Sequence, residues 1–112
     1  LLKVRVFYFG TNLSDITALS YGGLNAHAKY LKNNSAAKLQ VSGHTDERGT
    51  REYNLALGER RANAVARYLV GLGVSADQLS VVSYGKEKPV ADGSDEESWA
   101  KNRRVEVDYT AQ

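Results

Sequence analysis

Short runs of β-branched and aromatic residues, three of them ending at a glycine, alternate in this chain with longer segments of helical composition. The strand-like runs are residues 3–9, 39–43, 81–84 and 105–109, and apolar side chains recur at helical spacing between the first three runs. The resulting order is β-α-β-α-β-β. It predicts a two-layer α/β (α+β) sandwich, in which two right-handed crossovers and a returning last strand form a mixed four-stranded sheet with two main helices.

Local signals suggest where the helices and loops begin and end. Ser14 or Asp15 is expected to cap the first helix, residues 16–31. The second helix is expected over residues 54–69. Two shorter features complete the prediction: a capped single turn at residues 74–79, and a helical turn at residues 98–102 that follows a polar loop.

Composition narrows the class of protein. At 112 residues the chain is expected to form one domain, residues 1–112, and the lack of cysteine excludes disulfides and thiolate metal sites. The net charge of +2 is small and acids alternate with bases, which argues against a nucleic-acid partner. No apolar run is long enough to span a membrane. Because the chain starts at Leu1 and contains no methionine, we expect it to be excised from a longer protein whose targeting or anchoring segment is absent.

Charged residues of both signs fall close to one strand end. Asp46 lies in a polar loop bounded by glycines after the second strand, and Arg61 lies on the helix that follows. Asn54 and Arg61 are seven positions apart, so they point nearly the same way on a helix. A fixed carboxylate and a fixed guanidinium suit a ligand that carries both an ammonium and a carboxylate. A phosphate polymer would favour cations only.

The same residues allow other interpretations. Asp46 and Arg61 alone are equally compatible with a structural ion pair. His44 is expected to be a loop histidine bonded to backbone, and Trp99 a packing anchor rather than a platform for sugars. The sequence shows no nucleophile beside an ordered base and no metal-ligand spacing, so neither an enzyme, nor a metal site, nor a cofactor is expected.

Four separated motifs follow one another along the chain. They are Gly-His-Thr-Asp-Glu-Arg-Gly-Thr with Glu-Tyr-Asn just after it (residues 43–54), Leu-Gly-Glu-Arg-Arg-Ala (57–62), Val-Ser-Tyr-Gly-Lys-Glu-Lys-Pro (82–89) and Asn-Arg-Arg-Val-Glu (102–106). Together they closely resemble the OmpA-like peptidoglycan-binding domain family, and the similarity runs from Tyr8 to Val107. The resemblance implies a periplasmic, non-catalytic module of a Gram-negative bacterium. Such modules hold the outer membrane to the cell wall by binding the diaminopimelate side chain of stem peptides non-covalently.

The resemblance also assigns site residues. Asp46 and Arg61 match the ligand-binding aspartate and arginine of the family, so replacing either by alanine is expected to abolish wall binding and leave the fold intact. After the first strand the family has Phe-Asp-Phe-Asp-Lys, whereas this chain has Phe-Gly-Thr-Asn-Leu, so the affinity or stem-peptide preference is expected to differ. The complete predicted diaminopimelate site is Gly10, Thr11, Asn12, Asp46, Asn54, Leu57, Arg61 and Arg103.

Partners are implied in the same way. Members of this family that are lipid-anchored contact the β-propeller protein TolB within an envelope system active in cell division. The loop Glu-Arg-Gly-Thr and the run Ser-Tyr-Gly-Lys-Glu favour that lipid-anchored type over a β-barrel type. The alternative function is therefore a protein–protein adaptor whose main partner is TolB-like.

Overall fold

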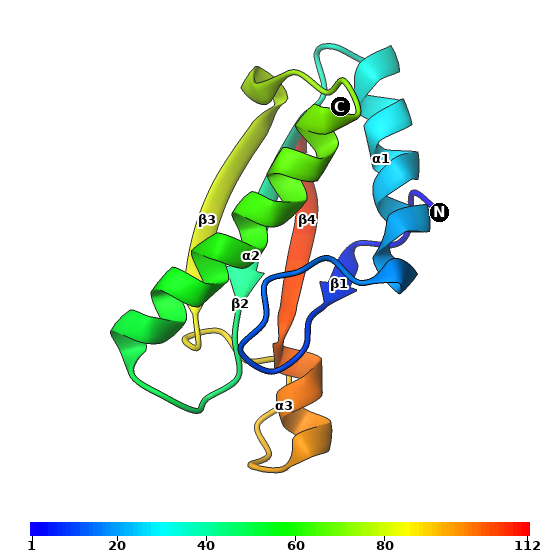
Figure 1. The fold of residues 1–112 in the computed structure, drawn as a ribbon. Coiled ribbons are helices and arrows are strands. Elements are labelled where there is room, and N and C mark those ends of the chain that lie inside the picture. The colour runs from blue at the N-terminus through cyan, green and yellow to red at the C-terminus, as the bar shows by residue number, and fades with distance from the viewer.

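One mixed four-stranded sheet, covered on one face by two long helices, forms the frame of the molecule (Figure 1). The computed structural model describes residues 1–112. The strand order is β1-β4-β2-β3. The central strand β4 is antiparallel to both of its neighbours, whereas β2 and β3 are parallel, as the predicted mixed sheet requires. The strand bounds are β1 (Val6–Tyr8), β2 (Lys38–His44), β3 (Leu79–Gly85) and β4 (Arg104–Ala111).

The first long helix begins later than the sequence suggested. Helix α1 spans Tyr21–Asn33, and a 3₁₀ turn at Ala18–Ser20 precedes it. Thr17 has an extended backbone, with φ −83° and ψ 157°, which interrupts any helix started at Ser14 or Asp15. The expected cap at those residues is therefore wrong.

The other two helices begin earlier than predicted, and in both the first turn is capped. Helix α2 is Arg51–Gly71, and the side chain of Thr50 accepts a hydrogen bond of 3.0 Å from the backbone N–H of Tyr53. Helix α3 is Glu96–Asn102, and Asp95 accepts from the N–H of Ser98 at 2.8 Å. The predicted capped turn before β3 is confirmed as a 3₁₀ turn at Ala76–Gln78.

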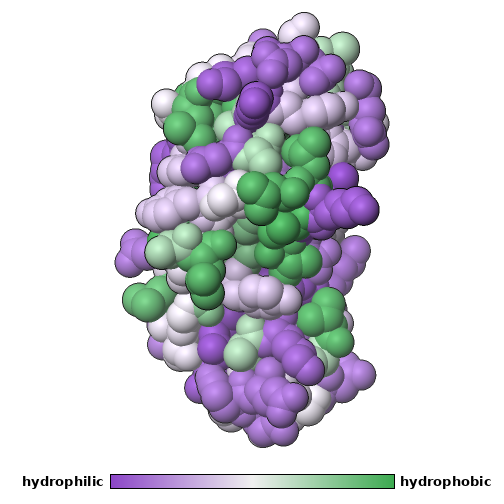
Figure 2. All heavy atoms as spheres, turned by 90° about the vertical axis from the view of Figure 1, so that its right-hand side faces the viewer, coloured by the Kyte–Doolittle hydropathy of each residue, from purple (hydrophilic) through white to green (hydrophobic).

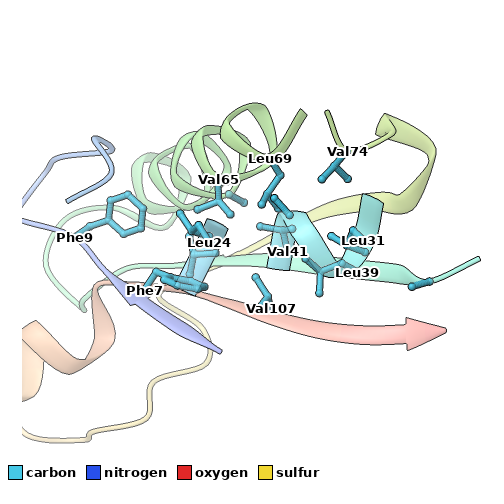
Figure 3. Packing of buried hydrophobic residues seen from close by; sticks show 14 residues of the cluster. Phe7, Phe9, Leu24, Leu31, Leu39, Val41, Val65, Leu69, Val74 and Val107 are labelled. Carbon is cyan, nitrogen blue, oxygen red and sulfur yellow. The ribbon is translucent and has the colours of Figure 1, made fainter. Parts of the chain in front are cut away.

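The hydrophobic core lies between the sheet and the two long helices (Figure 3). Most of its members come from β1, α1, β2, α2 and β4, and the others from the segments between them, so the core joins parts that are far apart in the chain. Buried apolar area of this kind is the main stabilising contribution to the fold. The labelled members are Phe7, Phe9, Leu24, Leu31, Leu39, Val41, Val65, Leu69, Val74 and Val107.

Two glycines let α2 approach the sheet closely. A Cβ atom on Gly43 of β2 would lie 1.7 Å from the carbonyl oxygen of Gly58 in α2, so backbone meets backbone at this point. Next to it, the hydroxyl of Ser83 donates to the carbonyl of Leu55 at 2.8 Å and ties β3 to the same helix. This contact fixes the end of β2, from which the residues of the candidate site follow.

Polarity varies along the length of the molecule. On the face that carries α1, hydrophobic atoms gather near the middle, and the end where α3 lies is mostly hydrophilic (Figures 1 and 2). The exposed apolar side chains Leu1, Leu2 and Val4 belong to the N-terminal segment. None of the helices has the length and apolarity that crossing a bilayer demands.

His44 differs from the loop histidine expected from the sequence. It is the last residue of β2, it is buried, and its Nδ1 atom has no hydrogen-bond partner. Its ring stacks on that of Tyr84, with 5.4 Å between the centroids. Burial lowers the pKa of His44 from 6.5 to about 4, and the nearby cation Arg104 adds to this effect.

This buried imidazole makes stability depend on pH. The unfolded chain binds a proton near pH 6.5 and the folded chain near pH 4, so the stabilisation is complete above pH 6.5 and is lost as the pH falls toward 4. We expect the free energy of unfolding to fall by on the order of 3 kcal/mol over that window because of His44. Urea denaturation at several pH values measures this loss.

Two histidine variants separate the contributions of His44 and His27 to the pH dependence of stability. In His44→Gln the loss between pH 6.5 and 4 should be much smaller than in the wild type. His27→Gln is the comparison: the pKa of His27 is also lowered by burial, so this variant reports the contribution of the second buried histidine, whose two ring nitrogens have partners in Tyr109 and the carbonyl of Val4. An unchanged pH dependence in His44→Gln would contradict the prediction.

Candidate functional site

Three segments meet at the end of the sheet where β2 stops. They are the turn after β1, the loop between β2 and α2, and the short helix α3 (Figure 1). The backbone N–H of Phe9 donates to the carbonyl of Arg103 at 2.9 Å and holds two of these segments together. A cleft of about 340 Å³ opens between the first two segments. It is lined by Thr11, Asn12, Asp46, Arg48, Gly49 and Tyr53.

Asp46 is the anion of the cleft, and it is already paired. Its carboxylate accepts two hydrogen bonds from the Arg48 guanidinium, 2.8 Å from Nη2 and 3.2 Å from Nε, and one of 3.0 Å from the Arg48 backbone N–H. A second guanidinium, that of Arg103, lies 3.7 Å away. Burial by itself would raise the pKa of Asp46, but the hydrogen bonds from Arg48 outweigh it and lower the pKa below its ordinary value. The carboxylate is therefore ionised at neutral pH.

Arg61 lies beneath this cleft and is 0% exposed. Its Nε donates to the carbonyl of Leu13 at 2.8 Å, and Nη2 donates to that of Gly10 at 2.9 Å. Its Nη1 donates to the carbonyl of His44, also at 2.9 Å. Burial lowers the pKa of Arg61 to about 10, an effect that the nearby Asp46 opposes. Arg61 thus fastens the turn after β1 to the end of β2.

This arrangement changes two expectations from the sequence. The ion pairs of Asp46 are with Arg48 and Arg103, so a direct structural ion pair with Arg61 is not formed. Arg61 also holds three backbone carbonyls in a buried position, so its removal should disturb the fold. The expectation that Arg61→Ala leaves the fold intact no longer holds.

Thr11 and Asn12 line the cleft as predicted, whereas Asn54, Leu57 and Arg103 surround it. Asn54 is buried on α2, and its amide donates to the carbonyl of Arg48 at 2.8 Å, which fixes the loop. Leu57 is buried one turn further along the helix. Arg103 donates to the carbonyl of Phe9 at 3.0 Å and to Glu96 at 3.0 Å, so its guanidinium is held from two sides.

The turn after β1 forms the rim of the cleft. It closes with a backbone hydrogen bond of 3.1 Å from Leu13 to Gly10. Asn12 has φ +58°, in the left-handed region that asparagine tolerates better than most residues. Its side-chain oxygen lies 3.3 Å from the Tyr53 hydroxyl, which donates to it. Asparagine at this position is therefore suited to the turn conformation.

Sequence reasoning missed Arg48, Gly49 and Tyr53 as cleft residues. The guanidinium of Arg48 lies 4.1 Å above the ring of Trp99, whose Nε1 donates to Glu47 at 2.9 Å. Trp99 thus packs at the rim, as predicted. The one available signal for Arg48 was its place two residues after Asp46, but only the loop conformation brings the two side chains together.

The chain is similar in sequence to known proteins. The model of the OmpA family matches residues 8–103 of the chain. The peptidoglycan-associated lipoprotein of Pseudomonas aeruginosa is 59% identical over 107 residues, which make up 96% of this chain and 63% of the relative. The protein of the same name from Haemophilus influenzae is 55% identical, over 96% of this chain and 70% of the relative. The chain therefore spans only part of the length of these relatives.

Solved structures agree with the fold. The crystal structure of the peptidoglycan-associated lipoprotein from Burkholderia pseudomallei has a TM-score of 0.96 at 49% identity, covering 97% of this chain and 92% of that one. The C-terminal domain of Helicobacter pylori MotB has a TM-score of 0.86 at 27% identity, covering 97% of this chain and 86% of that one. The resemblance and the fold class inferred from the sequence motifs are confirmed.

Proposed function

This chain belongs to the OmpA family, and we propose that it is a non-catalytic module that binds peptidoglycan through the diaminopimelate side chain of the stem peptide. The observation that carries the proposal is the ionised carboxylate of Asp46 in a cleft bordered by guanidinium groups. The tip of that side chain bears an ammonium and a carboxylate on one carbon. A site with an anion and cations in close proximity is complementary to such a tip.

In this proposal Asp46 accepts the ligand ammonium, and Arg61 donates to the ligand carboxylate. Arg61 has five N–H donors and uses three of them on carbonyls, so one hydrogen remains on each terminal nitrogen. Because Arg61 is fully buried, the groups that cover it shift when the carboxylate reaches it. Thr11, Asn12 and the carbonyl-rich turn at Gly10 form the rim against which the peptide lies.

The expected strength of one contact explains how the module would work in the cell. A charge-assisted hydrogen bond contributes roughly 1.5–3 kcal/mol net, and ordering the peptide offsets part of the sum. Single stem peptides are thus held weakly, and firm attachment comes from many copies facing many sites. We place the module at the periplasmic face of the outer membrane, lipid-anchored in the full-length protein. There it would tether that membrane to the wall in a Tol–Pal-like system with a TolB-like partner.

The test is a titration with two matched stem peptides, one containing diaminopimelate and one containing lysine. Lysine lacks the terminal carboxylate, so we expect its peptide to bind roughly 10- to 100-fold more weakly, the equivalent of one or two lost charge-assisted hydrogen bonds. Isothermal titration calorimetry measures both affinities. Equal binding of the two peptides would refute recognition of the zwitterionic tip.

A further inference from the structure

We infer that Arg48 makes this site selective for a zwitterionic tip, by occupying Asp46 in the free domain and transferring to the ligand carboxylate when the ligand ammonium takes its place. The inference rests on the proposed function and gives a role to Arg48, a residue of the quoted motif to which the resemblance assigned no ligand contact. Its starting point is the bidentate contact of Arg48 with both oxygens of Asp46. An ammonium that approaches Asp46 meets a carboxylate whose two oxygens are already engaged.

The consequence differs between a simple amine and a zwitterion. A simple amine that displaces Arg48 forms one ion pair and breaks one, and it leaves the guanidinium without a counter-ion in the cleft. A zwitterion supplies a carboxylate as well, so the displaced guanidinium is paired again. Two ion pairs then replace one. Arg48 therefore penalises ligands that carry only an ammonium, which is selectivity through an unfavourable alternative.

The side chain of Arg48 can change its partner, whereas its backbone is held in place. Its side chain is 42% exposed, and Trp99 supports the guanidinium from one face at 4.1 Å. The backbone is held, because the carbonyl of Arg48 accepts from Asn54 and its N–H donates to Asp46. A short rotation of the guanidinium over the aromatic ring keeps the cation–π contact while the ion-pair partner changes.

Arg103 cannot take this role. Its side chain is only 11% exposed, and its Nε and Nη1 atoms donate to the carbonyl of Phe9 and the carboxylate of Glu96. It lies 3.7 Å from Asp46, which is outside hydrogen-bond range. Of the two cations paired with Asp46, Arg48 alone is both in direct contact and mobile enough to be exchanged.

The experiment compares the ratio of affinities for the diaminopimelate peptide and the lysine peptide. In Arg48→Ala we expect this ratio to fall roughly tenfold relative to the wild type, because the lysine peptide no longer displaces a cation and the diaminopimelate peptide loses one partner. Arg51→Ala is the matched control. It removes the same charge three residues away, and Arg51 is 64% exposed and paired with Glu87 rather than Asp46. The ratio of the two peptide affinities in Arg51→Ala should equal that of the wild type.

The outcomes separate this inference from the proposed function. If the wild type prefers the diaminopimelate peptide and Arg48→Ala keeps the same ratio, the exchange is wrong and the proposed function stands. An equal fall in Arg48→Ala and Arg51→Ala would also overturn the exchange, because net charge alone would then explain the result. A wild type that does not discriminate between the peptides overturns both. Thermal unfolding of each variant confirms that the fold is retained.

Discussion

Gly43→Ala is expected to lose most of the stability of the domain. The added Cβ would lie 1.7 Å from the carbonyl oxygen of Gly58 and 2.5 Å from its carbonyl carbon. Both are backbone atoms, so no side-chain rotation relieves the overlap, and α2 has to move away from β2. We expect a loss of about 4 kcal/mol or more, which is a large part of the 5–15 kcal/mol by which domains are typically stable. Urea denaturation followed by circular dichroism measures it.

Gly71→Ala is the control for this experiment. Gly71 is the last residue of α2, and a Cβ there meets nothing within 4 Å. Replacing glycine by alanine in a helix usually stabilises it by up to about 1 kcal/mol. A Gly43→Ala domain as stable as the wild type would mean that the close approach of α2 to β2 is not required.

Asp46→Asn is expected to abolish binding of the diaminopimelate peptide while the domain stays folded. The change keeps the shape of the side chain but removes the charge that, on the proposed function, receives the ammonium, so we expect at least roughly 100-fold weaker binding. The asparagine oxygen can still accept from the Arg48 backbone N–H, the bond that now measures 3.0 Å. Calorimetry and co-sedimentation with purified sacculi measure the loss of binding.

Arg61→Met provides the contrast. It leaves the carbonyls of Gly10, Leu13 and His44 without their buried donor, so stability and binding should fall together. In Asp46→Asn binding should fall far more than stability. Retained binding in Asp46→Asn, or a midpoint of thermal unfolding as low as that of Arg61→Met, would contradict this division of roles.

The sequence predicted the fold because hydrophobic period and turn residues are local signals. Alternating apolar residues marked β2, and helical spacing marked α2, and both lie where expected. The start of α1 was missed because the extended backbone of Thr17 is not visible in its residue type. The first two residues of α3 were missed although Asp95, of a residue type that often caps helices, precedes them in the sequence.

The sequence motif predicted where the site residues lie in the fold but not which groups they contact. The motif placed Asp46 after β2 and Arg61 on α2, and the structure agrees. The partners of these residues depend on long-range geometry: Arg61 donates to Gly10 and Leu13, which lie 51 and 48 positions away in the chain. Arg48 is only two residues from Asp46, and the bend of the chain at Glu47 brings the two side chains together. Such contacts have no signature in composition or spacing.

The guanidinium of Arg61, carried by α2, joins the turn after β1 to the end of β2 in a chain that has no cysteine. It stabilises the fold as a covalent cross-link does in other small domains. On the proposed function it also binds the wall fragment. A resistance mutation at Arg61 would then also lower the stability of the domain. An antibacterial compound anchored on that buried cation would meet a target with little freedom to change.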